Sequence, residues 1–206
     1  MRSMKKRLFM FFLVFACLTA SCGPKKIPEA VTAFEENGLW GFRDGRGQIV
    51  IEPGFQAAYD FRGQIAAVAV AEGWRFIDRG GHILDIRPFM TDNGPDDYVE
   101  GLARFVKDGR IGFLNEEGRA VIPAQFDFAA PFSEGLAAFC IGCRKITEGE
   151  HASMKGGRWG FINVLGEMAI KPDYEEAAPF EDGRARVKLG GEWIDIDRLG
   201  KTAEAF

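Results

Sequence analysis

The chain has 206 residues, of which 47 % are hydrophobic and 27 % are charged, and its formal net charge is −4 at pH 7. A moderately acidic chain with this share of charged residues is expected to be soluble. Nucleic-acid binding needs clustered cations that neutralise phosphates, so the acidic balance argues against that class of partner.

The first 21 residues have the pattern of an export signal. An apolar run from Leu8 to Ala20 follows four cations, and small residues come after it. The run is too short for the roughly 20 residues that cross a bilayer as a helix. We therefore expect residues 1–21 to be a signal peptide. Its removal would take away four cations and leave a net charge of about −8. The four cations are Arg2, Lys5, Lys6 and Arg7.

The residues from Leu18 to Cys22 resemble the lipobox of bacterial lipoproteins, in which the cysteine is acylated and becomes the first residue of the mature chain. Thr19 stands where that motif more often carries leucine. The resemblance implies a lipid anchor on Cys22, membrane attachment through it and a place in the bacterial cell envelope. Gly23 is compatible with outer-membrane sorting. Processing at Cys17, or an ordinary secretory signal, stays open.

A motif then recurs five times at the same register, after a linker expected over residues 22–36. Its origins are separated by 34, 37, 48 and 34 residues, which indicates a repeat with a period of about 34. We expect a repeat domain over 37–206. The origins are Trp40, Trp74, Ile111, Trp159 and Trp193. The expected units are about 37–70, 71–107, 108–154, 155–188 and 189–206.

Each complete unit contains three strand signals. The first is Trp-x-Phe, whose aromatic side chains share a face because side chains alternate along a strand. A hairpin turn follows, with glycine seven residues after the origin. The second is an aliphatic run that a proline should end. In the third, small residues alternate with polar ones, as in Ala185 and Val187. The expected aliphatic strands are 48–52, 83–86, 120–122 and 168–171.

These signals predict an all-β fold of tandem three-stranded antiparallel units. One such unit is marginal alone and must pack on its neighbours. We expect an open, curved array, and a propeller-like ring is the alternative. The fifth unit carries Ile194 and Asp195 in place of the motif's Gly and Phe, so it is either a cap or a degenerate copy.

The pattern W-G-F-x-[DN]-x-x-G, followed by an aliphatic run with proline and by F-x-x-G-x-A, resembles WG-repeat proteins over about residues 37–202. The functions of that family are mostly undefined, so the resemblance implies a fold and no activity. We interpret the recurring aromatic residues as core, in preference to a sugar-stacking platform. The motif residues are Trp40, Gly41, Phe42, Trp74, Phe76, Gly112, Phe113, Trp159, Gly160, Phe161 and Trp193.

An insertion over residues 140–157 breaks the third unit, and we expect any specific function there because loops more often carry function than strands do. Cys140 and Cys143 could form a local disulfide, a redox pair, or part of a metal site with His151. Zinc needs about four ligands and a redox pair needs a helix N-terminus. The disulfide is the default in an exported protein. Free thiols remain a further alternative.

A shorter insertion in the second unit offers Asp92, Asn93, Asp96 and Asp97 as oxygen ligands, but without the spacing of a calcium loop. We interpret it as a polar turn and expect no metal and no cofactor. The chain has no Gly-x-Ser-x-Gly and no phosphate-binding Gly-Lys-Ser, so we assign no catalytic residue. Paired carboxylates stay open, because spatial pairing cannot be read from the chain.

The leading functional hypothesis is a non-catalytic, lipid-anchored scaffold that binds another envelope protein through its exposed face or its insertions. A module that binds carbohydrate or peptidoglycan through exposed aromatic residues is the first alternative. A hydrolase with carboxylates at one rim is the second. The fold does not decide among them.

Overall fold

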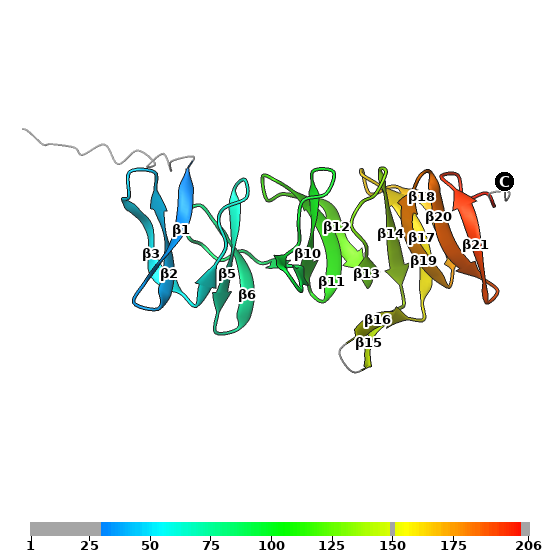
Figure 1. Ribbon diagram of the computed structural model, residues 1–206, viewed down its shortest axis with the longest axis horizontal. Coiled ribbons are helices and arrows are strands. Elements are labelled where there is room, and N and C mark those ends of the chain that lie inside the picture. The colour runs from blue at the N-terminus through cyan, green and yellow to red at the C-terminus, as the bar shows by residue number, and fades with distance from the viewer. Residues whose placement is uncertain (1–29, 149–150, 203–206) are drawn as a thin grey trace, which may run out of the picture.

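The computed structural model describes residues 30–148 and 151–202, and none of these residues is helical. The expected signal peptide and Cys22 lie outside the described residues. Among the described residues, no helix is long and apolar enough to cross a membrane. Five antiparallel sheets follow one another along the long axis, and the first and last lie at opposite ends (Figure 1). The array is therefore open, and the all-β prediction is confirmed.

The five sheets are built from consecutive stretches of the chain. The first contains β1 (Val31–Glu36), β2 (Leu39–Asp44) and β3 (Ile49–Phe55). The second contains β4 (Ala57–Ala58), β5 (Ile65–Val70) and β6 (Gly73–Asp78). The third contains β7 (Arg87–Pro88), β10 (Leu102–Lys107), β11 (Arg110–Asn115) and β12 (Ala120–Phe126). The fourth contains β13 (Phe128–Ala129), β14 (Leu136–Ile141), β17 (Arg158–Asn163) and β18 (Met168–Tyr174). The fifth contains β19 (Glu176–Glu181), β20 (Arg184–Leu189) and β21 (Glu192–Asp197).

Two short hairpins stand apart from these sheets, one in each insertion. They are β8 (Met90–Thr91) with β9 (Gly94–Pro95), and β15 (Arg144–Glu148) with β16 (His151–Lys155).

The sheets are offset by one strand from the sequence units. The small-residue strand that ends one unit, here called its closing strand, pairs with the Trp-x-Phe strand of the next unit: Ala67 lies opposite Phe76, and Ala138 opposite Phe161. The prediction of tandem three-stranded antiparallel sheets is confirmed, and their boundaries are shifted by one strand relative to units counted from the tryptophan. The reason is the turn, because closing and Trp-x-Phe strands are mostly joined by only two residues.

The first sheet shows the same offset at the start of the described chain. Its closing strand is β1, which pairs along its whole length with β2, Val31 opposite Asp44 and Glu36 opposite Leu39. The strand lies within the segment expected as a linker, so the paired array begins at Val31.

The glycine of the Trp-Gly-Phe motif lies where the neighbouring aliphatic strand bulges. A Cβ on Gly160 would lie 2.6 Å from the Ile170 carbonyl oxygen and 2.8 Å from the Pro172 nitrogen. Gly41 and Gly112 meet the same obstacle. The ladder between β17 and β18 shifts register at this point. The proline thus sits inside a bulged strand and does not end it, contrary to the sequence expectation.

The second unit lacks this glycine and also lacks the bulged strand. Arg75 occupies the glycine position, and the run 83–86 forms only a single bridge, between Ile77 and Ile83. The predicted strand over 83–86 is therefore not formed. Arg75 carries a Cβ at the point where the bulge of the aliphatic strand would have to lie.

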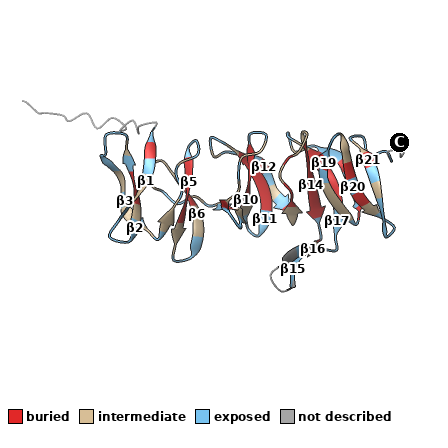
Figure 2. Ribbon diagram, in the orientation of Figure 1, coloured by how far each residue is buried: buried red, intermediate tan, exposed pale blue. Residues whose placement is uncertain are grey.

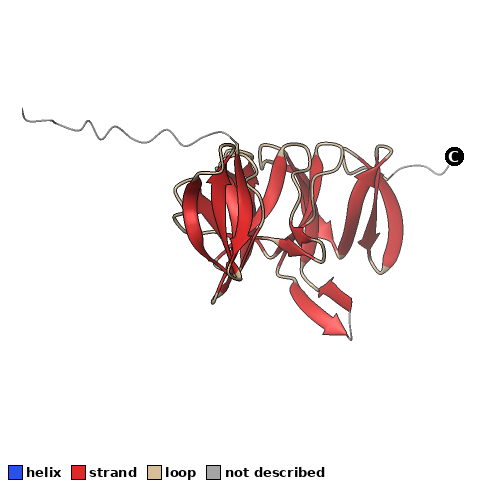
Figure 3. Cartoon of the chain, turned by 60° about the vertical axis from the view of Figure 1, so that its left-hand side comes forward, coloured by secondary structure: helices blue, strands red, loops and turns tan. Residues whose placement is uncertain are grey.

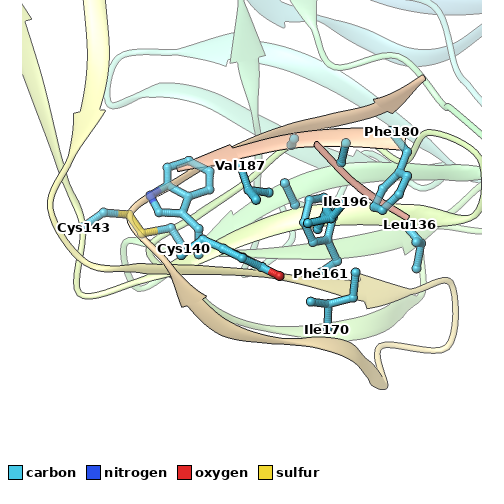
Figure 4. Packing of buried hydrophobic residues seen from close by; sticks show 13 residues of the cluster. Leu136, Cys140, Cys143, Phe161, Ile170, Phe180, Val187 and Ile196 are labelled. Carbon is cyan, nitrogen blue, oxygen red and sulfur yellow. A yellow bond between two sulfur atoms is a disulfide. The ribbon is translucent and has the colours of Figure 1, made fainter. Parts of the chain in front are cut away.

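Aromatic pairs between neighbouring sheets form the core. Phe161 on β17 is fully buried and packs edge-on against Phe180 of the next sheet, with ring centroids 4.9 Å apart. Phe42 with Phe61 and Phe113 with Phe132 repeat this contact. The closing strands β5, β10 and β14 are buried through much of their length (Figure 2). Figure 4 shows the cluster around Phe161 and Phe180.

The tryptophans differ in burial although they share one register position. Trp159 is 6 % exposed, whereas Trp193 is 43 % exposed. Trp40 and Trp74 are half-buried. The prediction that the motif tryptophans are core is therefore wrong for Trp193. The tryptophan is the second residue of its strand, so its burial depends on which side chains the neighbouring segments place over the ring.

Candidate functional site

Two hollows coincide with the two insertions. A pocket of about 470 Å³ lies beside the shorter insertion, between the second and third sheets. A groove of about 720 Å³ lies beside the insertion hairpin β15–β16 and reaches from the third sheet to the fifth. Each departure from the 34-residue period thus has a hollow beside it, and a third hollow of about 570 Å³ lies away from both insertions, beside residues 83–87.

The pocket contains a buried ion pair between Arg104 and Asp96. Both side chains are 7 % exposed, and the guanidinium holds the carboxylate through two hydrogen bonds of 2.7 and 2.8 Å. Arg104 also donates to the Ala129 carbonyl and lies 3.9 Å from the centroid of the Phe89 ring. Asp96 is therefore committed to a structural contact. No described cluster of three or more His, Cys, Asp or Glu residues could hold a metal ion.

The other polar groups of this pocket are also engaged. Asp97 pairs with Arg62 at 2.6 Å, and Asp60 accepts a hydrogen bond from the Ala33 amide at 2.7 Å. Burial raises the pKa of the Tyr98 phenol to about 12, so the group stays protonated near neutral pH. Each carboxylate that lines this pocket therefore already has a partner, and the pocket offers no support for the hydrolase alternative.

The insertion hairpin grows out of a two-residue turn. Ile141 pairs with Arg158, and the next residues inward, Gly142 and Gly157, have φ of +80° and +72°. The turn between β20 and β21 consists of two glycines with φ of +60° and +84°. Two residues with positive φ are what a type I′ hairpin turn requires. The insertion therefore separates the two halves of such a turn and projects from the array (Figures 1 and 3).

A disulfide closes the base of this hairpin. The structure joins Cys140 to Cys143, and both residues are buried (Figure 4). A Cβ on Gly157 would collide with the Cys143 amide nitrogen and lie 2.6 Å from the Ile141 carbonyl oxygen. The base of the hairpin, formed by residues 140–143 and Gly157, is thus tightly packed. The side chain of His151 lies outside the described part of the molecule.

Aromatic and aliphatic side chains from three successive sheets line the groove. Three of them, Ile111, Trp159 and Trp193, occupy the origin position of consecutive motif copies. Phe128 packs against Trp159, with centroids 5.6 Å apart, and Met154 of the hairpin adds a flexible apolar wall. The buried Nε1 of Trp159 has no hydrogen-bond partner among the described residues.

The charged groups of the groove are arranged around this apolar lining. Asp127 is paired with Arg110 at 2.6 Å, and Glu176 with Lys188 at 3.2 Å. Lys145 lines the groove and is exposed. The Lys188 ammonium also lies 6.0 Å from the centroid of the Trp193 ring. An apolar groove with a charged rim of this kind is suited to binding a partner.

The sequence pointed to the insertion but not to most of the residues that surround it. Phe89 and Glu176 come from other units and enter the groove only through the stacking of sheets, and Phe128 comes from an earlier part of the third unit. The motif residues Gly41, Gly112 and Gly160 have structural roles at the bulges. The Arg104–Asp96 pair was also missed, because a cation on the outer face of a closing strand ordinarily faces water.

Comparison with protein families identifies the repeat. The family model for the WG-containing repeat matches residues 40–74, 111–142 and 159–193. These matches begin at the three copies in which glycine follows the origin residue and a bulged strand is present. The chain is a WG-repeat protein, as the motif indicated. No curated protein and no solved structure matches it.

Proposed function

We propose that this WG-repeat protein is a non-catalytic scaffold of the cell envelope that holds another protein in the groove beside its insertion hairpin. The observation that carries the proposal is the groove itself, about 720 Å³ in volume and lined by aromatic side chains from three sheets. Concave apolar sites with a few placed polar groups are the usual binding sites of proteins.

The partly exposed tryptophan is the expected anchor. Trp193 is 43 % exposed at the groove, and tryptophan is among the residues that most often dominate the energy of an interface. The surrounding sheets are held by buried aromatic pairs, so little ordering is needed when a partner binds.

Attachment through Cys22 would suit this arrangement. The described chain enters the array at the first sheet, whereas the groove spans the third to the fifth (Figure 1). An anchor at one end would leave the groove accessible at the other. Metabolic labelling with an alkyne fatty acid should mark the wild-type chain, and Cys22→Ser should abolish the label. A labelled Cys22→Ser variant would contradict the proposed anchor.

The binding function can be tested in intact cells with a photocrosslinking amino acid. Ser153 is exposed and lines the groove, whereas Gln48 is exposed on a turn of the first sheet. The probe at position 153 should capture a defined protein, the control at 48 should not, and Trp193→Ala should reduce the yield. Equal yields at both positions, or none at 153, would contradict binding in the groove.

A carbohydrate or peptidoglycan ligand is the second candidate, and it is favoured by the exposed ring of Trp193. The test is sedimentation of the protein with purified cell wall. Binding that Trp193→Ala abolishes would move the proposal from a protein partner to a glycan.

A further inference from the structure

The insertion hairpin offers strand edges beside the groove. β15 and β16 pair with each other and with no other described strand. Lys145 and Met154 are cross-strand partners and both line the groove, so one face of the hairpin forms its wall. A two-stranded hairpin is marginal alone, and an unpaired edge is a template for a further strand. The geometry therefore suits an extended segment.

The hairpin also carries a group of exposed cations. Arg144, Lys145 and Lys155 are exposed, and none forms an ion pair with another described residue. These three positive side chains stand on a chain whose net charge is −4.

The carboxylates that line the groove are already engaged in ion pairs. They are Asp127, which is paired with Arg110, and Glu176, which is paired with Lys188. The guanidinium of Arg186 lies 5.7 Å from the centroid of the Trp193 ring and is exposed. Of the charged residues that line the groove, Lys145 is therefore the one without an ion-pair partner among the described residues, which favours an acidic partner and disfavours a basic one.

We infer that the groove binds an extended acidic segment of a partner protein, with a carboxylate near Lys145 and an apolar side chain against Trp193. The inference rests on the proposed binding function and specifies the chemistry of its partner. Packed sheets lie roughly 10 Å apart, so the two intervals between three sheets span about 20 Å. An extended chain rises about 3.3 Å per residue, so a bound segment of about six residues would span the groove.

A selection from random peptides tests this chemistry without assuming a sequence. The full chain, immobilised in detergent, is offered a displayed library of random 12-residue peptides, and the enriched peptides are sequenced. Two charge-reversed variants are run in parallel. Lys145→Glu with Lys155→Glu changes the hairpin, and Arg46→Glu with Arg119→Glu makes the same change of net charge at exposed turns of other sheets. Circular dichroism checks that all three chains are folded.

The wild type and the turn variant should enrich peptides in which Asp and Glu outnumber Lys and Arg and which contain a large apolar residue. Enrichment should fall about tenfold or more on the hairpin variant, because like charges now face each other. Neutral or basic enriched peptides, or equal enrichment on the hairpin variant, would overturn the inference. If the probe at 153 still captures a protein in cells, the scaffold function stands and only the acidic chemistry fails.

Discussion

Gly160 lies on β17 opposite the bulge of β18, where the backbone of Ile170 and Pro172 leaves no room for a Cβ. The obstacle is backbone, which cannot rotate away as a side chain could. The motif therefore needs glycine for space, whereas the tryptophans at the origin position differ in burial, from Trp159 at 6 % exposed to Trp193 at 43 %.

Replacement of Gly160 by alanine should destabilise the protein strongly. Overpacking against fixed neighbours costs about 3 kcal/mol, so we expect a loss of that order in urea unfolding. Gly45→Ala is the matched control, because a Cβ there would meet nothing within 4 Å. Equal losses for the two variants would show that the bulge can move.

Trp159 and Trp193 should respond differently to truncation, although they share a register position. Trp159→Ala removes a buried aromatic side chain and should cost about 3 to 5 kcal/mol. Trp193→Ala removes a partly exposed ring and should cost about 1 kcal/mol or less. Chemical denaturation of both variants measures the difference. A large loss for Trp193→Ala would mean that its role is to hold the fold and not to face a partner.

At the scale of the elements, alternation along a strand could be predicted from the sequence but the pairing of strands could not. Ala185 and Val187 are buried and Arg186 is exposed, as the pattern indicated. Alternation shows which face of a strand is buried and says nothing about its hydrogen-bond neighbour. The two-residue turns carried that information, since Asn37-Gly38 and Asp108-Gly109 are strong hairpin signals.

The candidate site could be predicted only as a location. The spacing of 48 residues placed an insertion before Trp159, and its hairpin does form one wall of the groove. The opposite walls come from residues far apart in the chain, such as Phe89 and Glu176. Their proximity results from the rotation between stacked sheets, which no local pattern encodes.

The buried pair in the shorter insertion gives a test that uses adjacent residues. Asp96→Asn leaves the Arg104 guanidinium buried without a counter-charge and should cost about 3 to 5 kcal/mol. Asp97→Asn breaks an ion pair whose side chains are 55 % and 78 % exposed, so it should cost less than about 1 kcal/mol. Urea unfolding of the two variants compares them, and similar losses would contradict the structural role of Asp96.

The disulfide at the base of the hairpin leads to a chemical prediction. With Cys140 and Cys143 joined, the native protein should contain neither as a thiol that iodoacetamide can alkylate after denaturation. Treatment with dithiothreitol should expose both. Mass spectrometry of the peptides counts the modified cysteines, and two alkylated residues without reductant would rule out the disulfide.

At the scale of the whole molecule, the array should not need its insertion hairpin. Deletion of residues 143–156 would leave Gly142 next to Gly157, two residues that already have positive φ and match the Gly190-Gly191 turn. We expect a folded chain whose melting temperature changes by only a few degrees, because most of the inter-sheet core is untouched.

The same deletion should abolish capture of the partner at the groove. Differential scanning fluorimetry and photocrosslinking from a probe at Ala178, which also lines the groove, measure the two effects separately. A deletion variant that fails to fold would show that the hairpin helps to hold the fourth and fifth sheets together.

The offset between motif and sheet decides where this molecule can be divided. A repeat unit excised at its tryptophan would lose the closing strand of the preceding unit, which pairs with its Trp-x-Phe strand. That closing strand would stay in the rest of the protein with an unpaired edge. The chain can be cut without dividing a sheet at points where a bulged strand leads into the next sheet. Such points lie after Phe55, Phe126 and Tyr174. Shortened, lengthened or recombined versions of the protein should be spliced at those three places, and not at the boundaries that the repeat displays in its sequence.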